Sequence, residues 1–229
     1  MKITNEDNMK LMSRYGDNHF DLCITSPPYN LGNKHHTGNK YFTPYKDDLN
    51  EVDYQKKQIE FLNELHRVCK DDSSVFYNHK NRIRNGLQIS PYEWIFQTKW
   101  KVKQEIVWYN RSQNFDNIRF YPFTERIFWL SKSKETKFKN NIGLTDFNKW
   151  KPEGTNKKHK RAFPLSLCEA ILLCYPKNLK VIEPYLGSGT MAIACHNLGF
   201  NLTACELDKE YYNAAMKRIN NHTAQLRIC

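Results

Sequence analysis

The sequence has seven cysteines, but no two of them form a C-x-x-C pair. This absence excludes the usual zinc-knuckle and thiol-redox motifs. The seven are Cys23, Cys69, Cys168, Cys174, Cys195, Cys205 and Cys229. Several lie inside apolar runs, which predicts buried, reduced thiols in a cytoplasmic protein.

Long apolar runs are absent as well. No run approaches the roughly 20 residues that a membrane-spanning helix requires, so no membrane partner is expected. The first ten residues lack the apolar centre of a secretory signal peptide, and we expect no such leader. The histidines His35, His36 and His79 lack the spacing of a metal site, so no bound metal is predicted.

The composition has a large excess of positive charge. The 229 residues carry a formal net charge of +11, with 40% apolar and 14% aromatic residues. These values predict a globular protein with a polyanionic partner, nucleic acid before a membrane surface, although a basic protein without such a partner stays open. Between residues 131 and 161, ten Lys or Arg stand against three acids. Because this stretch also lacks apolar periodicity, we expect a surface insertion apart from the core.

Apolar patterns typical of strands and helices alternate along the chain. Predicted strands are Lys2–Asn5, Phe20–Thr25, Ser74–Tyr77, Glu105–Tyr109, Arg126–Leu130, Lys180–Glu183 and Asn201–Cys205. Predicted helices are Asp53–Cys69, Tyr92–Trp100, Pro164–Cys174, Met191–Leu198 and Lys209–Ile219. The order predicts an α/β fold with a mostly parallel twisted sheet, in which Glu105–Tyr109 and Arg126–Leu130 form an antiparallel edge hairpin. The run Asp71-Asp72-Ser73 is expected to break the chain before its strand.

A turn with two glycines, Gly187-Ser188-Gly189-Thr190, lies between a predicted strand and a predicted helix. Small residues there allow the backbone to approach a ligand closely. Glu206 ends the next strand, seventeen residues beyond Gly189, where its carboxylate can accept hydrogen bonds from both ribose hydroxyls of a nucleoside cofactor. The pattern predicts a nucleoside-binding turn, with a plain tight turn as the alternative.

Three kinds of cofactor site were compared for this turn. A phosphate-binding P-loop requires a lysine after its glycines, and none is present. A dinucleotide site stays open because Gly187-x-Gly189-x-x-Ala192 matches that fingerprint. Glu183, at the end of the preceding strand, favours S-adenosylmethionine, because a carboxylate suits the cationic methyl donor and repels a pyrophosphate.

The tetrapeptide Ser26-Pro27-Pro28-Tyr29 follows a predicted buried strand. Two prolines fix two φ angles and remove two amide donors, so the carbonyls face a defined direction. The Ser26 hydroxyl and the Pro27 carbonyl can then hold both hydrogens of an amino group, and Tyr29 offers a face on which a base can stack. A Pro-Pro turn that only ends the strand is the alternative.

Such a site suits methylation of an exocyclic amine, which is a poor nucleophile because its lone pair is delocalised into the ring. Two acceptors that hold its hydrogens favour a tetrahedral nitrogen, whose lone pair can attack a sulfonium methyl group. The base must first leave the duplex by base flipping. The position at a strand end supports this interpretation, because ligands of α/β sheets bind there.

The chain resembles the amino-group DNA methyltransferases, which form N6-methyladenine or N4-methylcytosine. Thr25-Ser26-Pro27-Pro28-Tyr29-Asn30 is similar to their catalytic motif, and residues 183–190 are similar to their cofactor motif, D-P-F-x-G-S-G-T. The motif order is similar to the permuted group called β, in which the target-recognition region lies between the two motifs. The resemblance extends over nearly the whole chain.

The resemblance implies a Rossmann-like, S-adenosylmethionine-dependent methyltransferase fold with helices on both faces of the sheet and a circularly permuted motif order. It implies one catalytic domain over residues 1–229, with residues 131–160 as a short target-recognition insertion. The implied cofactor-binding residues are Asp7, Phe163, Glu183, Pro184, Tyr185, Gly187, Ser188, Gly189, Thr190 and Glu206. The implied DNA contacts are Asn30, Lys132, Lys134, Lys137, Lys139, Lys157, Lys158 and Lys160, beside the catalytic Ser26, Pro27, Pro28 and Tyr29.

The departures from the family pattern also carry information. Glu183 and Tyr185 stand where Asp and Phe are usual, and both changes are mild. Ser26 in place of Asp slightly favours N4 of cytosine over N6 of adenine. The short recognition stretch is compatible with a homodimer or with a short recognition sequence on double-stranded DNA. The implied role is restriction-modification with a cognate restriction enzyme, or epigenetic marking, in a prokaryotic or phage setting.

Three other functions stay open on the sequence. A methyltransferase for RNA or for a protein amide shares the same chemistry, although the basic stretch argues against a protein substrate. A non-catalytic DNA-binding protein explains the charge but not the two motifs. A nicotinamide-dependent oxidoreductase explains the glycines but leaves the Ser-Pro-Pro-Tyr segment and the charge unexplained.

Overall fold

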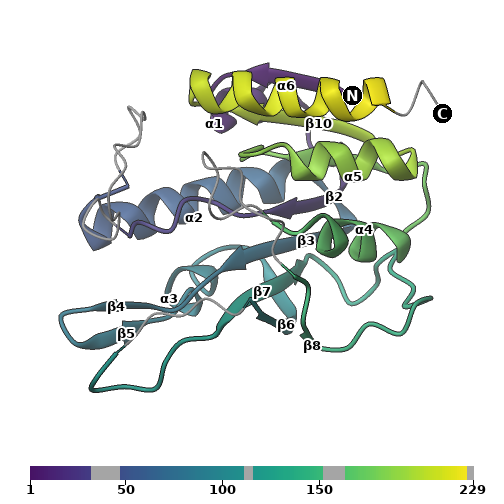
Figure 1. The fold of residues 1–229 in the computed structure, drawn as a ribbon. Coiled ribbons are helices and arrows are strands. Elements are labelled where there is room, and N and C mark those ends of the chain that lie inside the picture. The colour runs from purple at the N-terminus through teal and green to yellow at the C-terminus, as the bar shows by residue number, and fades with distance from the viewer. Residues whose placement is uncertain (32–46, 111–115, 152–162, 226–229) are drawn as a thin grey trace.

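The computed structural model describes residues 1–31, 47–110, 116–151 and 163–225 (Figure 1). The strands are β1 (Lys2–Asn5), β2 (Phe20–Thr25), β3 (Cys69–His79), β4 (Arg82–Arg84), β5 (Leu87–Ile89), β6 (Lys101–Tyr109), β7 (Thr124–Ser131), β8 (Phe147–Asn148), β9 (Lys180–Glu183) and β10 (Asn201–Glu206). The helices are α1 (Asn8–Ser13), α2 (Glu51–Val68), α3 (Tyr92–Ile95), α4 (Leu165–Leu173), α5 (Thr190–Leu198) and α6 (Lys209–Gln225).

The described residues form one eight-stranded sheet and a separate hairpin of β4 and β5. The sheet order is β1-β10-β9-β2-β3-β7-β6-β8. The first five strands in this order run parallel, β7 is antiparallel to β3 and β6, and β8 pairs with β6 in parallel. The predicted α/β fold with a mostly parallel sheet and an antiparallel hairpin is therefore confirmed. The short strand β8, which was not predicted, covers the outer side of that hairpin.

Strand β2 shows how the layers are built. All six of its residues are buried. Because side chains alternate along a strand, Leu22 and Ile24 join a hydrophobic core with residues of α4, α5 and α6. Cys23 points to the opposite face and joins a second core with residues of α1, α2 and α3. Helices thus cover both faces of the sheet, as Figure 1 shows.

Strand β3 differs from its prediction. It runs from Cys69 to His79, and Asp71-Asp72-Ser73 does not interrupt it. Instead, the pairing with β2 shifts its register between Cys69 and Ser74, so that the extra residues bulge out of the ladder. A bulge inserts residues without ending a strand, and polarity alone does not distinguish it from a turn.

Helix α3 is shorter than predicted and ends at Ile95 rather than near Trp100. The Thr98 hydroxyl donates to the Ile95 carbonyl at 2.7 Å, and the Trp100 indole donates to the Leu62 carbonyl at 2.7 Å. These contacts turn the chain toward β6. The bond from Trp100 to Leu62 is a tertiary contact, which the local apolar pattern does not reveal.

The described part of the basic stretch that begins at residue 131 is mostly exposed or half-buried, as predicted for a surface segment, but it is not separate from the core. Its strand β8 joins the sheet, and Phe138, Leu144 and Trp150 pack against the core on the α4 face. The Phe138 ring lies 4.6 Å from the Trp129 ring. A few irregularly spaced apolar residues cover this face without producing a periodic pattern.

The two ends of the parallel strands define two edges of the sheet. The carboxyl edge contains the last residues of β2, β3, β9 and β10 and the first residue of β7; the amino edge contains the opposite ends. In Figure 1 the carboxyl edge lies on the left, where the β4–β5 hairpin projects, and the chain after β7 loops out on the right. Ligands of open α/β sheets bind at the carboxyl edge.

Two further predictions concern single residue types. The six described cysteines are all buried and free of disulfides, as predicted for reduced thiols, while Cys229 lies outside the described residues. Among the described helices, none has the length and apolar character that crossing a membrane requires.

Candidate active site

The segment Ser26-Pro27-Pro28-Tyr29 leaves the sheet at the carboxyl end of β2. Since β2 lies between β9 and β3, the segment is flanked by the ends of both strands. Pro27 is buried, while Ser26 and Tyr29 are half-buried. The chain ends its pairing here because proline has no amide hydrogen to continue a central strand.

The Tyr29 hydroxyl is the centre of a polar cluster. It lies 2.9 Å from Ser26 Oγ and donates to Glu125 Oε2 at 2.9 Å. Asn78, near the end of β3, donates through Nδ2 to the Tyr29 hydroxyl and to Glu125 Oε2, the latter at 2.9 Å. Asn110 donates to Glu125 Oε1 at 2.8 Å. The sheet thus gathers residues from β3, β7 and the end of β6 around the predicted catalytic segment.

Tyr29 is held as a neutral phenol. Burial, together with the Glu125 carboxylate beside it, raises the pKa of Tyr29 well above its ordinary value. Its ring centroid lies 4.5 Å from that of His79, which covers one face of the ring. At neutral pH the hydroxyl therefore stays protonated and acts as a hydrogen-bond donor.

Sequence reasoning missed both Asn78 and Glu125. Asn78 is 1% exposed and follows the apolar residues 75–77, and Glu125 is half-buried at the start of the largely apolar β7. A polar residue at the end of an apolar strand is the signal that points to such positions, because buried polar groups require partners. Only the antiparallel return of β7 beside β3 shows that the two side chains meet.

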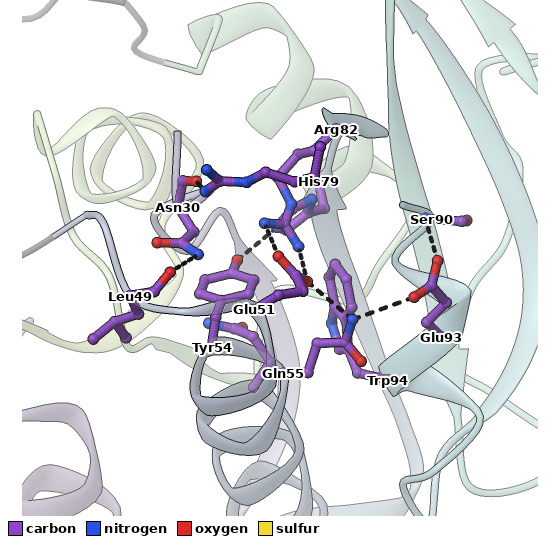
Figure 2. A network of polar contacts seen from close by, with 12 residues as sticks. Asn30, Leu49, Glu51, Tyr54, Gln55, His79, Arg82, Ser90, Glu93 and Trp94 are labelled. Carbon is purple, nitrogen blue, oxygen red and sulfur yellow. Dashed lines mark hydrogen bonds and ion pairs between the residues drawn. The ribbon is translucent and has the colours of Figure 1, made fainter. Parts of the chain in front are cut away.

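The Pro28 carbonyl is held by a second group of buried residues, seen in part in Figure 2. The Tyr54 hydroxyl donates to the Pro28 carbonyl at 2.8 Å and lies 2.7 Å from His79 Nε2. His79 Nδ1 lies 2.8 Å from the Lys80 carbonyl, which can only accept, so this nitrogen carries the proton. Nε2 of the neutral ring is then an acceptor as well, and the single Tyr54 hydrogen is shared between the Pro28 carbonyl and His79 Nε2. Burial lowers the pKa of His79 to about 3, and the ring is neutral at physiological pH.

Arg82 supports the same region through contacts that are drawn in Figure 2. Its guanidinium donates to both Glu51 oxygens, at 2.8 and 2.6 Å, and its side chain is 1% exposed. It also lies over the rings of Tyr54 and Trp94, at 4.6 and 5.4 Å from their centroids. A buried guanidinium is stable only with such a partner. Its neighbours in the sequence, the basic run 80–84, gave no sign that this arginine is buried.

Asn30, predicted to contact DNA, is 1% exposed and lies inside the protein. It adopts a left-handed conformation with φ of +55°, which asparagine tolerates better than most residues. Its amide donates to the Leu49 carbonyl at 2.9 Å, its backbone N–H donates to Asp47 at 2.6 Å, and its carbonyl accepts from Arg84. These contacts hold the chain that follows the catalytic segment, and none is directed to solvent.

Glu183 connects the two predicted motifs. Its carboxyl group, at the end of β9, is 2% exposed and accepts from the Thr25 hydroxyl at 2.7 Å and from the Tyr185 N–H at 2.9 Å. Burial raises the pKa of Glu183 to about 8. Thr25 immediately precedes Ser26, so one hydrogen bond joins the glycine-turn motif to the Ser-Pro-Pro-Tyr motif.

The glycine turn adopts the conformation that its residues allow. Gly187 and Gly189 have φ of +54° and +80°, in the left-handed region. A Cβ on Gly187 would meet only the Tyr185 carbonyl, at 3.8 Å, so this residue borders open space. Glu206 at the end of β10 accepts from the Gly187 N–H at 2.9 Å and from the Asp208 N–H at 3.0 Å. Its carboxylate therefore lies at the turn, as predicted.

Arg218 of α6 braces this turn, and the sequence gave no sign of it. Its Nη1 donates to the Ser188 carbonyl at 3.0 Å, to Ser188 Oγ at 3.2 Å and to Thr190 Oγ1 at 2.8 Å. The Ser188 and Thr190 hydroxyls also lie 3.0 Å apart. The last helix thus fixes side chains that the fingerprint alone leaves free to rotate.

The remaining predicted cofactor residues lie in different environments. Asp7 is exposed and caps α1 by accepting from Met9 N–H at 2.9 Å. Pro184 is buried, and the Tyr185 ring packs 5.0 Å from the Phe61 ring of α2. Phe163 is half-buried beside Trp108, with ring centroids 6.4 Å apart. Asp7 belongs to the carboxyl edge because it follows β1, whose last residue pairs with Glu206.

The predicted DNA-binding lysines are not gathered at this site. Lys137 pairs with the buried Asp21 at 2.6 Å, and Lys132 lies 3.5 Å from Asp71. Asp21 lies near the start of β2, so these lysines lie at the amino edge; Lys134 and Lys139 occupy the same segment. Lys132 and Lys137 are thus paired with aspartates away from Ser26, and DNA contact by these four lysines stays a prediction. Lys157, Lys158 and Lys160 lie outside the described residues.

Exposed apolar residues mark another part of the carboxyl edge. The chain between β6 and β7 carries Ile118, 80% exposed, and Phe120, 100% exposed. Arg119 in this segment donates to the Gly86 carbonyl of the β4–β5 turn at 3.4 Å, and the adjacent Leu87 is 75% exposed. Two projecting segments thus present apolar side chains at the edge where Ser26 lies.

The family is shown by comparison of the chain with known proteins. A model of the N6- and N4-type DNA methylases, described as DNA methylase, matches residues 20–217. The chain belongs to this DNA methylase family. Among its relatives, the Type II methyltransferase M.BglII of Bacillus subtilis is 26% identical over 93% of this chain and 67% of its own length. The Type II methyltransferase M.SmaI of Serratia marcescens is 25% identical over 87% of this chain and 84% of its own length.

Two solved structures illustrate the shared fold. The cytosine-N4-specific PvuII DNA methyltransferase has a TM-score of 0.77 and 17% identity, over 96% of this chain and 90% of that one. M1.HpyAVI, solved as a complex with SAM, has a TM-score of 0.68 and 22% identity, over 96% and 98% of the two chains. The predicted family and the methyltransferase fold are therefore confirmed.

Proposed function

We propose that this DNA methylase transfers a methyl group from S-adenosylmethionine to an exocyclic amino group of a flipped-out base in double-stranded DNA. The observation that carries the proposal is the 2.7 Å hydrogen bond between Thr25 and Glu183. It joins the first residue of the cofactor motif to the residue that precedes Ser26, which supports donor and acceptor sites that adjoin at one edge of the sheet.

The residues at the glycine turn fit such a cofactor. The open space beside Gly187 admits close approach of a nucleoside, and the Glu206 carboxylate at the turn is placed to accept from ribose hydroxyls. Glu183 provides a buried carboxyl group for the cationic part of the donor. When bound, S-adenosylmethionine supplies an electrophilic methyl group on a sulfonium centre. Asp7, Phe163, Pro184, Tyr185, Ser188 and Thr190 complete the proposed cofactor site.

Two acceptors of the catalytic segment are proposed to hold the target amine. The Pro28 carbonyl is already paired with Tyr54, whereas no donor of the described residues reaches the Pro27 carbonyl. Ser26 Oγ and the Pro27 carbonyl then receive one amine hydrogen each, which localises the nitrogen lone pair for attack on the methyl carbon. Bound S-adenosylmethionine would supply the methyl group and leave as a neutral thioether, and the methylated nitrogen would lose one proton to water.

The base and the biological role are finer parts of the proposal. Ser26 slightly favours N4 of cytosine over N6 of adenine, and one neighbour in fold, the PvuII enzyme, is described as cytosine-N4-specific. The relatives named as Type II methyltransferases support a role in restriction-modification, with a cognate restriction enzyme as partner. A homodimer and a recognition role for residues 131–160, including Lys157, Lys158 and Lys160, belong to the same proposal.

The proposal is tested by incubating the chain with labelled S-adenosylmethionine and duplex DNA of varied sequence. Label in DNA, followed by nucleoside analysis, identifies N4-methylcytosine or N6-methyladenine. RNA and a glutamine-containing peptide serve as competing substrates. The proposal is contradicted if S-adenosylmethionine raises the melting temperature of the protein but no label appears in cytosine or adenine of the DNA.

A further inference from the structure

The hydrogens in the Ser26–Tyr29–Glu125 cluster can be placed in only one direction. Glu125 Oε2 accepts, and Tyr29 has one hydroxyl hydrogen, which it donates to this oxygen at 2.9 Å. The 2.9 Å contact between Ser26 Oγ and Tyr29 then needs a hydrogen from Ser26. The opposite direction leaves the Tyr29 oxygen facing the carboxylate with no hydrogen between them, which is repulsive.

Asn78 fits this direction. Its Nδ2 lies 2.9 Å from Glu125 Oε2 and contacts the Tyr29 hydroxyl. An amide nitrogen donates only, so the Tyr29 oxygen accepts from Asn78 and from Ser26 while its own hydrogen goes to Glu125. The reversed amide would bring its oxygen against the carboxylate, which excludes that orientation.

The consequence concerns what Ser26 can offer to a substrate. A free serine hydroxyl rotates and can donate or accept. Here its hydrogen is committed to Tyr29, and Asn78 Nδ2 donates weakly to Ser26 Oγ at 3.4 Å, so at least one lone pair remains for an incoming donor. Each hydroxyl in the chain is also polarised by the next, which increases the negative charge on Ser26 Oγ.

We propose that Glu125 is a positioning residue which, through Tyr29, makes Ser26 a dedicated hydrogen-bond acceptor for the amine of the target base. This inference rests on the proposed function and deepens it. An aspartate at position 26 would need no such help, because a carboxylate has no hydrogen to orient. Ser26 thus acts as a hydrogen-bond acceptor, as a carboxylate would, because two successive hydrogen bonds link it to Glu125.

The first test replaces Glu125 by Gln. The amide can donate to the Tyr29 oxygen, which frees Ser26 from its fixed direction. The single-turnover rate of methyl transfer at saturating cofactor should fall roughly tenfold or more, with the dissociation constants for S-adenosylmethionine and DNA little changed. Glu105→Gln is the matched control, because Glu105 lies on the same hairpin but pairs with Arg126 at 2.7 Å. The Glu105→Gln variant should retain the methyl-transfer rate of the unsubstituted chain.

The second test separates orientation of Ser26 from general support of the loop. In a Ser26→Asp background, the acceptor no longer depends on Glu125, and Glu125→Gln should change the rate less than about threefold or increase it. An equal fractional loss in both backgrounds shows that Glu125 only holds the loop and overturns the proposal. An unchanged rate for Glu125→Gln alone overturns it as well.

A third measurement does not require activity. Tyrosine labelled with ¹³C at Cζ is followed by NMR as pH rises, with Tyr29→Phe to assign the signal. Glu125→Gln should let Tyr29 ionise at a lower pH than in the unsubstituted chain, and no shift overturns the hydrogen-bonded chain. If the unsubstituted protein methylates no DNA, the proposed function fails, and this measurement still decides whether Glu125 acts on Tyr29.

Discussion

Arg218 and Thr190 are joined by a 2.8 Å hydrogen bond between Arg218 Nη1 and Thr190 Oγ1. The same nitrogen holds the Ser188 carbonyl, so helix α6 determines the shape of the glycine turn. Arg218→Met should weaken binding of S-adenosylmethionine about tenfold, in line with the loss of charge-assisted hydrogen bonds. Isothermal titration calorimetry measures it, with the exposed Lys217→Met as control. Equal affinities for the two variants contradict a bracing role.

Gly189 should not tolerate a side chain. Its φ of +80° costs an alanine about 1–2 kcal/mol, and the new Cβ would lie 3.0 Å from Ile219 Cδ1. Gly199 has a similar φ of +76° with no atom near its Cβ position, so Gly199→Ala reports the backbone cost alone. Urea unfolding should show a larger loss for Gly189→Ala, part of which Ile219→Val restores. Equal losses at the two glycines would exclude the steric contribution.

Glu183 should make stability fall as pH rises. Its folded-state pKa of about 8 lies above the ordinary value of 4.5, so folding retains a proton in this range. Its contribution is complete below about pH 4.5 and is lost as pH rises through 8, with a slope of up to ~1.4 kcal/mol per pH unit. His79, whose folded pKa is lowered to about 3, acts with the opposite sign only below about pH 6.5.

The window between pH 6.5 and 8 excludes the contribution of His79, while Glu206, whose pKa burial also raises, acts with the same sign as Glu183. Unfolding free energies from urea titrations should decline across it for the unsubstituted chain, and Glu183→Gln should flatten the decline. Replacing the exposed Glu60 of α2 by Gln should leave the slope as it was. A Glu183→Gln protein that keeps the full slope would mean that another group carries the proton.

The Glu51–Arg82 pair should respond unequally to removal of its two partners. Glu51→Ala leaves a guanidinium that is only 1% exposed without its anion, which should cost about 3 kcal/mol. Arg82→Met should cost less, because Glu51 is 26% exposed and can be hydrated. The double variant should be more stable than Glu51→Ala alone. Additive losses in thermal unfolding would show that the buried charge is not the cause.

Phe120 should contribute to DNA binding under the proposed function. It is fully exposed at the carboxyl edge, where an aromatic ring can stack on a base. Phe120→Ala should weaken duplex binding about fivefold or more, with affinity for S-adenosylmethionine unchanged. Leu173, 47% exposed at the end of α4, provides the control substitution Leu173→Ala. Fluorescence anisotropy measures both, and equal DNA affinities for the two variants count against this surface.

The sequence by itself determined the α/β layout and the two motifs. Phe20–Thr25 was predicted with its observed bounds because a strand buried on both faces must be apolar throughout. The glycine turn and Glu206 could be assigned because positive φ and a strand-end acid are local requirements. The bulge in β3 and the end of α3 could not be predicted, since both depend on pairing with distant segments.

Only the tertiary structure decided which polar residues act together. Ser26, Asn78 and Glu125 are separated by dozens of residues and meet because β7 returns antiparallel beside β3. Arg82 and Arg218 look like ordinary surface charges in the sequence, and packing alone commits one to Glu51 and the other to the glycine turn. The basic stretch shows the opposite case, in which a residue predicted to contact DNA has a structural partner. Lys137 pairs with the buried Asp21 at the amino edge. Net charge does not reveal this, because it records how many charges a chain has and not where the fold places them.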